Sequence, residues 1–289
     1  EAGRRTSLAG VPIAGIFGDQ QAAAFGQAAF GPGDAKGSFG TGAFLSMNTG
    51  VRPMISENGL VSTVAYRLGS KPPVYGVEGS IADAGSVLQW MRDELGLFAR
   101  TPDADKLAAS VRDSGGAHIV PAFSGLFAPH WRPDARGTIV GLTRYVTKAH
   151  LARAALESSA FAAREVVDAM NADVLATGLG APVEELRVDG SLTTNDDLMQ
   201  LLADLLDVPV VRPEVVETTA LGAAYAAGLA VGHWESLDDI APNWTSDKRW
   251  EPSLPVPERD RRLRVWKKAV AHAVDWVDAD TTPDDLVTT

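Results

Sequence analysis

The chain has 289 residues, enough for one large domain or two ordinary ones, and its 45% hydrophobic and 22% charged composition is typical of a folded protein. Its formal net charge of −11 argues against a surface that binds nucleic-acid phosphates, so no nucleic-acid partner is expected. The absence of cysteine excludes disulfides, thiolate metal ligands and a cysteine nucleophile, and the five histidines form no i, i+4 pair typical of a metal site.

No apolar run reaches the roughly 18 residues of a membrane span, and the first ten residues lack the apolar core of a secretory signal. We therefore expect no membrane span and a cytoplasmic location. Because the chain starts without methionine, at what reads as the middle of a domain, we also expect it to be a fragment or a processed product.

In the first half of the chain, short apolar segments alternate with turn residues. The pattern predicts a buried strand at 11–18, a short helix at 20–30, a Gly- and Pro-rich turn at 31–37, strands at 38–50, 60–68 and 74–80, an amphipathic helix at 82–98, a helix at 104–112, and strands at 117–123 and 137–142. The loop between these last two strands holds Arg132, Arg136 and Asp134, for which an internally satisfied Arg–Asp cluster is slightly preferred over a role beside a cleft.

The second half alternates strands with longer helices. It predicts a helix at 148–173, a β-α-β unit at 185–191, 195–207 and 208–213, a helix dense in small residues and suited to close packing at 218–232, an amphipathic helix at 257–278, and a mobile tail at 278–289. This alternation predicts an α/β fold.

Asp19 lies where the first predicted strand gives way to a helix, in "GDQQAAAFGQ". Its carboxylate could cap that helix, which is the reading that the local pattern favours. It could also be a general base at the carboxyl end of a strand, where α/β folds bind their ligands, with Gln20 beside it hydrogen-bonding a polyol.

Two turns are candidates for binding phosphates. "GSFGTGAF" places Gly40 and Gly42 around Thr41 and exposes backbone N–H groups, but it lacks the lysine of a P-loop and a β-hairpin is equally consistent with it. "VDGSLTTND" is a strand, a tight turn and a helix start, which could receive an adenosine or its phosphates.

A helix face is a third candidate. Gly85 and Gln89 lie one turn apart on a predicted helix, so they share a face that could admit a flat base. A glycine at such a position more often lets another helix pack closely.

Taken in order, these stretches resemble the carboxyl-terminal half of the FGGY family of carbohydrate kinases, almost continuously from about Val11 to about Trp250. The resemblance is carried by "GDQQAAAFGQ", "GTGAFLSMNTG", "EGSIADAGSVLQWMRD", "PAFSGLFAPHWRPDARGTIVGLTR" and "PEVVETTALGAAYAAGLAVG", and residues 137–157 fit the second signature of the family. The first of these segments favours the members that act on glycerol over those that act on xylulose or gluconate.

The resemblance implies the ribonuclease H-like α/β architecture shared with actin and hexokinase, with the amino-terminal partner domain largely missing. Residues 1–28 would be the terminal piece of that amino-terminal kinase domain, on the substrate side and carrying the base, and residues 29–289 the carboxyl-terminal nucleotide-binding domain. It further implies ATP-dependent phosphorylation of glycerol to glycerol 3-phosphate with Mg²⁺, by a homo-oligomer that is a dimer or a tetramer.

The resemblance also assigns roles to single residues, and it reverses the local preference for Asp19 as a helix cap. Asp19 corresponds to the catalytic base, with a possible contact to Mg²⁺, and Gln20 and Phe44 correspond to neighbours of glycerol. The positions that correspond to nucleotide contacts are Thr41, Gly85, Gln89, Ser191 and Asn195.

The chain departs from the family pattern in three places. Ser191 follows Asp189-Gly190 where the family has a second glycine, which affects the adenosine site. Gly10 stands in "RRTSLAGVP" where members inhibited by fructose 1,6-bisphosphate carry an arginine, so we expect weak or absent inhibition. The amino-terminal wall of the cleft is missing, so we expect the chain alone to be inactive. A kinase for another polyol or sugar, and a non-catalytic nucleotide-binding module, remain as alternatives.

Overall fold

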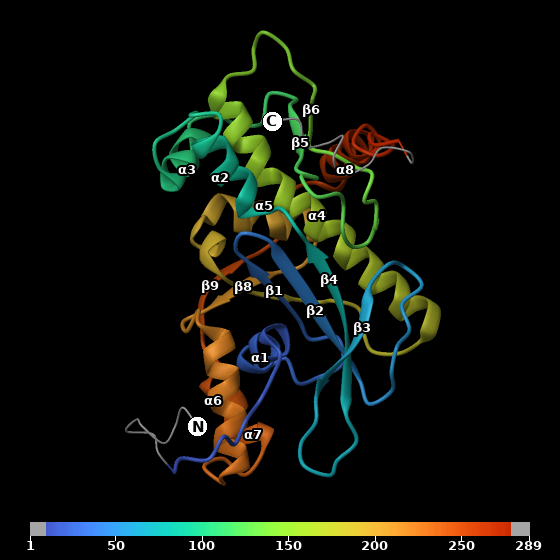
Figure 1. Cartoon of the computed structure of the whole chain (residues 1–289), viewed down its shortest axis with the longest axis vertical. Helices are drawn as coiled ribbons and strands as arrows, with labels where there is room; N and C mark the ends of the chain where they lie inside the picture. The colour runs from blue at the N-terminus through green and yellow to red at the C-terminus, as the bar shows by residue number, and fades with distance from the viewer. Residues whose placement is uncertain (1–9, 279–289) are drawn as a thin grey trace.

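The computed structural model describes residues 10–278, which form a seven-stranded main sheet with helices on both faces and a smaller cap at one end (Figure 1). The strands are β1 (Ala35–Phe39), β2 (Ala43–Gly50), β3 (Val61–Tyr66), β4 (Val74–Ile81), β5 (His118–Val120), β6 (Thr138–Val140), β7 (Leu186–Asp189), β8 (Val210–Pro213) and β9 (Ser246–Trp250). The helices are α1 (Asp19–Gly26), α2 (Gly85–Asp93), α3 (Thr101–Ala109), α4 (Lys148–Thr177), α5 (Asp196–Leu206), α6 (Thr218–Ala230), α7 (Leu237–Ile240) and α8 (Val256–Ala271), with 3-10 turns η2 (Ser191–Thr194) and η3 (Ala241–Asn243).

The main sheet has the strand order β3-β4-β2-β1-β7-β8-β9. Strands β3, β4, β2 and β1 pair antiparallel in this spatial order, so β2 and β3 are not neighbours, whereas β1, β7 and β8 run parallel to one another. A mixed sheet with crossover helices is the α/β architecture that the alternation of elements predicts, and the prediction of fold class is confirmed.

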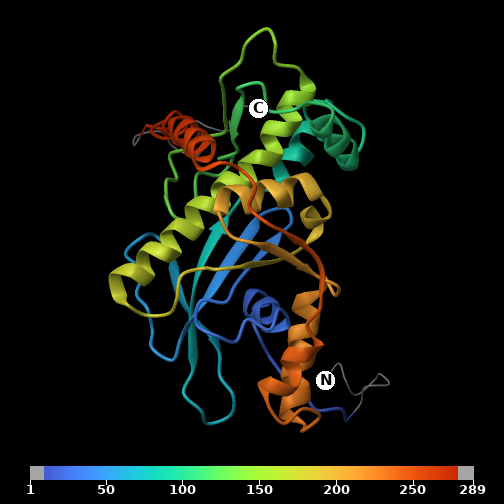
Figure 2. The same ribbon diagram turned by 180° about the vertical axis from the view of Figure 1, so that it is seen from behind.

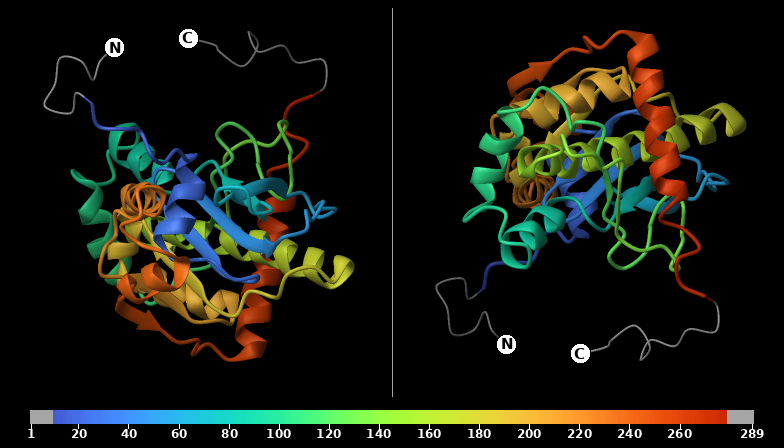
Figure 3. Two further views of the ribbon diagram at one scale, coloured as in Figure 1. Left: turned by 90° about the horizontal axis from the view of Figure 1, so that it is seen from below. Right: turned by 90° about the horizontal axis from the view of Figure 1, so that it is seen from above.

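Different helices cover the two faces of the sheet. In Figure 3, α1 and α6 lie on one side of the strands, and α4 and α5 lie on the other. Helix α8 packs beside the small β5–β6 sheet at one end of the molecule, as the view from behind shows (Figure 2). The sheet is therefore the middle layer of three.

Helix α4 is the longest element and crosses the apolar face of the sheet. The side chains of Thr147 and His150 form a reciprocal capping box at its start, and Gly178, in the left-handed conformation, ends it. It lies so close to β4 that a Cβ on Gly79 would stand 2.4 Å from the Val166 side chain. Burial of this long alanine-rich face is the main source of the core.

Helices α1 and α6 pack through small residues. A Cβ on Gly26 would meet the Thr218 carbonyl oxygen at 2.0 Å, and one on Gly222 would meet the Ala22 carbonyl oxygen at 1.8 Å. These two positions require glycine, because any side chain would push the helix backbones apart. The expectation of close packing by the small-residue helix is confirmed.

The strand predicted at 11–18 is wrong. Residues 10–18 form no strand, and Val11, Ile13 and Ile16 are exposed. A strand needs a neighbour for its backbone N–H and C=O groups, and no residue between 10 and 278 pairs with this stretch. The apolar pattern alone did not carry that information.

Several boundaries also differ from the sequence pattern. The turn predicted at 31–37 ends earlier, because residues 35–37 belong to β1 and the chain reverses at 40–42 instead. The helices predicted at 82–98 and 257–278 are shorter, and α7 and β9 were not predicted.

Two of the predictions concern residues at the ends of the chain. The bisphosphate loop lies mostly in residues 1–9, and the predicted mobile tail lies almost wholly in 279–289, both outside the described residues. Within 10–278, no helix is long and apolar enough to cross a membrane.

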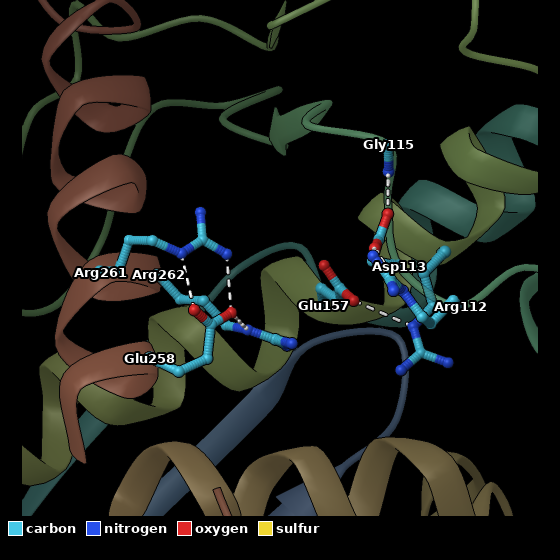
Figure 4. A network of polar contacts seen from close by, with 8 residues as sticks. Arg112, Asp113, Gly115, Glu157, Glu258, Arg261 and Arg262 are labelled. Carbon is cyan, nitrogen blue, oxygen red and sulfur yellow. Dashed lines mark hydrogen bonds and ion pairs between the residues drawn. The ribbon is translucent and has the colours of Figure 1, made fainter. Parts of the chain in front are cut away.

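Charged side chains on two segments of the cap form local ion pairs and hydrogen bonds. Figure 4 shows Glu258 of α8 between Arg261 and Arg262, with Oε1 accepting from both guanidinium groups at 2.7 and 2.9 Å. These bonds hold the pKa of Glu258 near 2. Asp113, in the same view, accepts the Gly115 amide at 2.9 Å. No predicted site residue takes part in these contacts.

Candidate functional site

Asp19 is the first residue of α1 and its carboxylate is exposed. Gly18 is the N-cap and offers no side chain, so the reading of Asp19 as the helix N-cap is wrong. The Asp19 Oδ1 atom accepts the backbone N–H of Gln20 at 2.8 Å, and a carboxylate in the first turn suits the positive end of the helix dipole. Its other oxygen has no partner among residues 10–278.

Lys36 lies below Asp19 on β1 and its side chain is fully buried. The Nζ atom donates to the Gln20 side-chain oxygen, to Ser38 Oγ at 3.1 Å and to the Phe44 carbonyl at 3.3 Å. Burial lowers the Lys36 pKa from 10.5 to about 8. The ammonium has no carboxylate within ion-pair distance in the described part of the chain.

Three carboxylates surround this ammonium at longer range. The charges of Asp189, Glu78 and Asp19 oppose the effect of burial and raise the Lys36 pKa, in that order of size. Glu78 on β4 is itself partly buried, which raises its pKa, and it accepts Gln21 Nε2 at 2.7 Å. The face of the sheet under α1 therefore holds one cation among three anions.

Asp189 connects this face to the other helix that covers it. Its Oδ2 atom accepts Gln27 Nε2 at 3.0 Å and the Thr218 hydroxyl at 2.7 Å. The Gln27 side-chain oxygen in turn accepts the Trp244 indole N–H at 2.9 Å. All of these groups but the tryptophan are buried, so α1, β7, α6 and the segment before β9 share one satisfied polar network.

The turn between β1 and β2 meets the start of α2. The N–H groups of Ala84 and Ser86 both donate to the Thr41 carbonyl, at 2.9 and 3.0 Å, and the Gly85 N–H donates to the Gly40 carbonyl at 2.9 Å. A Cβ on Gly85 would stand 2.6 Å from that carbonyl oxygen, so close packing requires this glycine. Gly40 and Gly42 form the turn of a β-hairpin, which was one of the two alternatives for this stretch, and Thr41 is exposed at its tip.

The turn after β7 lies against the same end of β1. Gly190 has φ +95°, and a Cβ there would stand 2.3 Å from the Phe39 carbonyl oxygen, so this position also requires glycine. Ser191 follows as an exposed residue that opens η2. The carboxyl ends of two parallel strands, with the exposed Thr41 and Ser191, therefore meet at one edge of the sheet.

Asn195 caps α5. Its Oδ1 atom accepts the Leu198 N–H at 2.9 Å, and its Nδ2 atom donates to Asp105 of α3 at 2.7 Å. Burial raises the pKa of Asp105, which this amide N–H partly opposes. Asn195 thus joins α3 to α5, whereas Gln89 is exposed on α2 and its side chain makes no hydrogen bond within the described residues.

The structure gathers the predicted residues into two groups joined by β1. Asp19, Gln20 and Phe44 lie around Lys36, with the Phe44 ring 40% exposed. Thr41 and Gly85 meet at the end of the strand, beside the turn that holds Ser191. Residues 10–278 contain no group of three His, Asp or Glu side chains arranged to hold a metal ion.

Sequence reasoning missed Lys36 because it assigned residues 31–37 to a turn. In a strand that begins at Ala35, the side chain of residue 36 points to the face opposite that of its small, buried neighbours Ala35 and Gly37. Lysine is rarely buried, so a lysine at this position of a central strand is the signal that could have identified it.

The Arg–Asp cluster of the aromatic loop is confirmed for Arg132, which donates to both oxygens of Asp134 at 2.7 Å. Arg136 takes no part in it and donates to the carbonyls of Pro133 and Ala135 instead.

Comparison with known families gives a match over most of the sheet and its helices. The model of the carboxyl-terminal domain of the FGGY family of carbohydrate kinases matches residues 35–231. Glycerol kinases of Paenarthrobacter aurescens and Renibacterium salmoninarum are each 61% identical, over 269 and 270 residues. Both alignments cover 93% of this chain but 52% and 53% of the relatives, so the chain spans about half of their length.

Solved structures agree with this match. The glycerol kinase of Plasmodium falciparum with ADP superposes with a TM-score of 0.84 at 36% identity, covering 93% of this chain and 53% of that one. A xylulose kinase of Lactobacillus acidophilus superposes with a TM-score of 0.70 at 23% identity, which shows a shared fold. The expected ribonuclease H-like kinase fold is thereby confirmed.

Proposed function

The chain belongs to the FGGY family of carbohydrate kinases, and we propose that it is the carboxyl-terminal half of a glycerol kinase, which phosphorylates glycerol to glycerol 3-phosphate with ATP. The observation that carries the proposal is the free carboxylate of Asp19, held at the start of α1 over a buried ammonium, in a chain 61% identical to glycerol kinases. The boundary at residue 28 between two kinase domains is part of this proposal.

Asp19 would act as the general base. Its exposed carboxylate takes the proton of the attacking hydroxyl, while Gln20 and the half-exposed Phe44 ring orient the polyol. The free oxygen of Asp19 suits this role, because a carboxylate that capped the helix would be engaged already. Phosphoryl transfer depends mainly on positioning and charge stabilisation, so a rigid base on a helix is what the reaction needs.

The nucleotide would bind at the edge where β1 and β7 end. Exposed Thr41 and Ser191 flank this edge, Gly85 and Gln89 share one face of α2, and Asn195 holds α5 in place. The Plasmodium relative was solved with ADP, which supports the assignment of a nucleotide. A magnesium ion would neutralise the phosphate charge, and Asp19 is the carboxylate that could contact it.

The resemblance to the family also supports a cytoplasmic homo-oligomer, either a dimer or a tetramer. The cleft requires the amino-terminal half, so the isolated chain should not phosphorylate glycerol. Turnover by the 289-residue chain alone would contradict this expectation.

The test joins this chain to the amino-terminal half of the Paenarthrobacter relative and measures ATP consumption over a panel of polyols and sugars. Glycerol should be the preferred acceptor. If another polyol or sugar were preferred, that compound would replace glycerol as the proposed substrate, and the assignment to the family would stand. Nucleotide binding without turnover of any acceptor would instead identify a non-catalytic module and overturn the proposal.

A further inference from the structure

Among residues 10–278, Lys36 is the one buried cation on the polar face of the sheet, and its environment is unusual for a lysine. The side chain is fully buried in the middle of the sheet, between β2 and β7. A buried ammonium without an ion pair costs folding free energy, and an apolar residue of the same length would usually be at least as stable. Stability therefore does not explain this lysine.

All three ammonium protons of Lys36 are accounted for. They point to the side-chain oxygen of Gln20, to Ser38 Oγ and to the Phe44 carbonyl. An ammonium has three donors and no acceptor, so none is left for a substrate or a phosphate. Lys36 must act through the groups that it holds rather than by touching a ligand itself.

Of these three groups, Gln20 is the one whose orientation depends on Lys36. A glutamine amide can present either its oxygen or its NH₂ group in a given direction. Because the ammonium can only donate, it binds the amide oxygen and leaves the Nε2 donors free. Nε2 has no partner among residues 10–278, and the half-buried side chain sits directly after Asp19.

We propose that Lys36 is a positioning residue of the acceptor site, which locks the Gln20 amide so that its NH₂ group donates to a hydroxyl oxygen of the polyol beside the hydroxyl that Asp19 deprotonates. This inference rests on the proposed function and deepens it. It separates the two neighbouring side chains by chemistry: Asp19 accepts the proton of one hydroxyl, and Gln20 donates a hydrogen bond to the oxygen of the next. A substrate with a second hydroxyl next to the reacting one can contact both the Asp19 carboxylate and the Gln20 amide.

The charged groups around Lys36 keep the ammonium in its donating state at neutral pH. Asp19 faces it from α1, Glu78 from β4 and Asp189 from β7, and these oppose the lowering of its pKa by burial. Above pH 8 the ammonium loses its proton and its charge. The orienting effect on Gln20 should then weaken. The plot of kcat/KM for glycerol against pH should therefore fall at alkaline pH, and this fall is its alkaline limb.

The experiment is a double-mutant cycle in the joined protein. Lys36→Met removes the ammonium at similar volume, Gln20→Ala removes its target, and Lys267→Met on the exposed face of α8 is the matched control. Lys36→Met should raise the KM for glycerol at least about tenfold and leave the KM for ATP within about twofold. The double variant should be no worse than Gln20→Ala, and the alkaline limb of kcat/KM should disappear.

A purely structural role predicts a different pattern. The KM values for glycerol and ATP and the melting temperature would then change together. The effects of the two substitutions would be additive in the double variant, and the alkaline limb would persist. Any of these results would overturn the role of Lys36. Unchanged glycerol kinetics in Lys36→Met would do the same.

A second variant covers the case in which Lys36→Met does not fold. Gln20→Glu keeps an oxygen for the ammonium but removes the NH₂ donors, so the glycerol KM should rise at least about tenfold. An unchanged KM in this variant overturns the proposal. If the unaltered joined protein turned over no polyol, the proposed function would fail first and the role of Lys36 with it.

Discussion

The two faces of the main sheet are built from alternate residues of the same strands, yet they have opposite chemistry. On the α4 side, β1, β2 and β4 present a wholly apolar set with four glycine and alanine positions, formed by Ala35, Gly37, Phe39, Ala43, Leu45, Met47, Val77, Gly79 and Ile81. On the α1 side the cross-strand row through Lys36 continues to Ser46 and Glu78. One face is a core, and the other is a polar layer beneath two helices.

The difference shows how one strand can serve stability and chemistry at once. Side chains alternate along a strand, so the residues of each face can be chosen independently of the other. Burial on the α4 face stabilises the sheet by hydrophobic transfer, which allows the α1 face to keep a buried charge that costs free energy. We expect substitutions on the two faces to separate activity from stability.

The largest expected effect is on activity, at the edge of the polar face. Asp19→Asn in the joined protein should lower kcat by about 10²–10⁴-fold, because a general base contributes that much. Unfolding free energy and nucleotide affinity should stay nearly constant, since the side chain is exposed. Steady-state kinetics and ATP titration measure both, with Asp260→Asn on α8 as the control. Normal turnover would show that the base is another residue.

The apolar face should give the opposite result. Leu45→Ala removes a side chain that is 1% exposed, so the free energy of unfolding should fall by about 2–5 kcal/mol. Urea denaturation of the 289-residue chain measures this loss. At temperatures where the joined variant stays folded, its KM values should not change. A large rise in the glycerol KM without a loss of stability would break the contrast between the faces.

Lys36 should make stability depend on pH, and the sign follows from its pKa. The folded pKa is about 8 and the ordinary value is 10.5, so between these the unfolded chain keeps a proton that the folded chain has lost. The cost of burying the ammonium is therefore fully present below pH 8 and is relieved as the pH rises, by at most about 3 kcal/mol.

Denaturation of the unaltered chain and of Lys36→Met at pH 7 and pH 10 tests this dependence. The difference in unfolding free energy should shift in favour of the unaltered chain at the higher pH. A difference that stays constant between the two pH values would mean that folding does not lower the Lys36 pKa, so that the ammonium keeps its proton in the folded chain throughout this range. Other titrating groups contribute equally to both proteins, so the comparison removes them.

The smallest effect concerns the hydroxyl in the middle of the polar row. Ser46 Oγ is buried without a hydrogen-bond partner, and so is Thr49 Oγ1 on the same strand. Ser46→Ala should raise the unfolding free energy by about 0.5–1 kcal/mol, because an unsatisfied polar group is removed. Thr49→Val should change it in the same direction. A loss of stability in both would mean that these hydroxyls are bonded, for example through buried water.

The sequence alone determined the family and most elements of this protein. Ordered motifs from "GDQQAAAFGQ" onwards predicted the FGGY kinase fold that the family match confirms, and long periodic segments such as 148–173 were located within a few residues. Periodicity succeeds there because the helix repeat extends over many turns. The roles of the predicted site residues remain predictions.

Only the tertiary structure decided what the short polar stretches do. It showed that Asp19 is not the helix cap, that residues 11–18 pair with no strand among those described, and that Lys36 is a buried strand residue rather than part of a turn. In each case the decisive partner lies far away in the chain: β7 beside β1, α6 beside α1, and α2 beside the tip of the hairpin. The local sequence pattern indicates which residues of a strand share a face. Whether a charge on that face is buried depends on which distant elements of the chain pack over it.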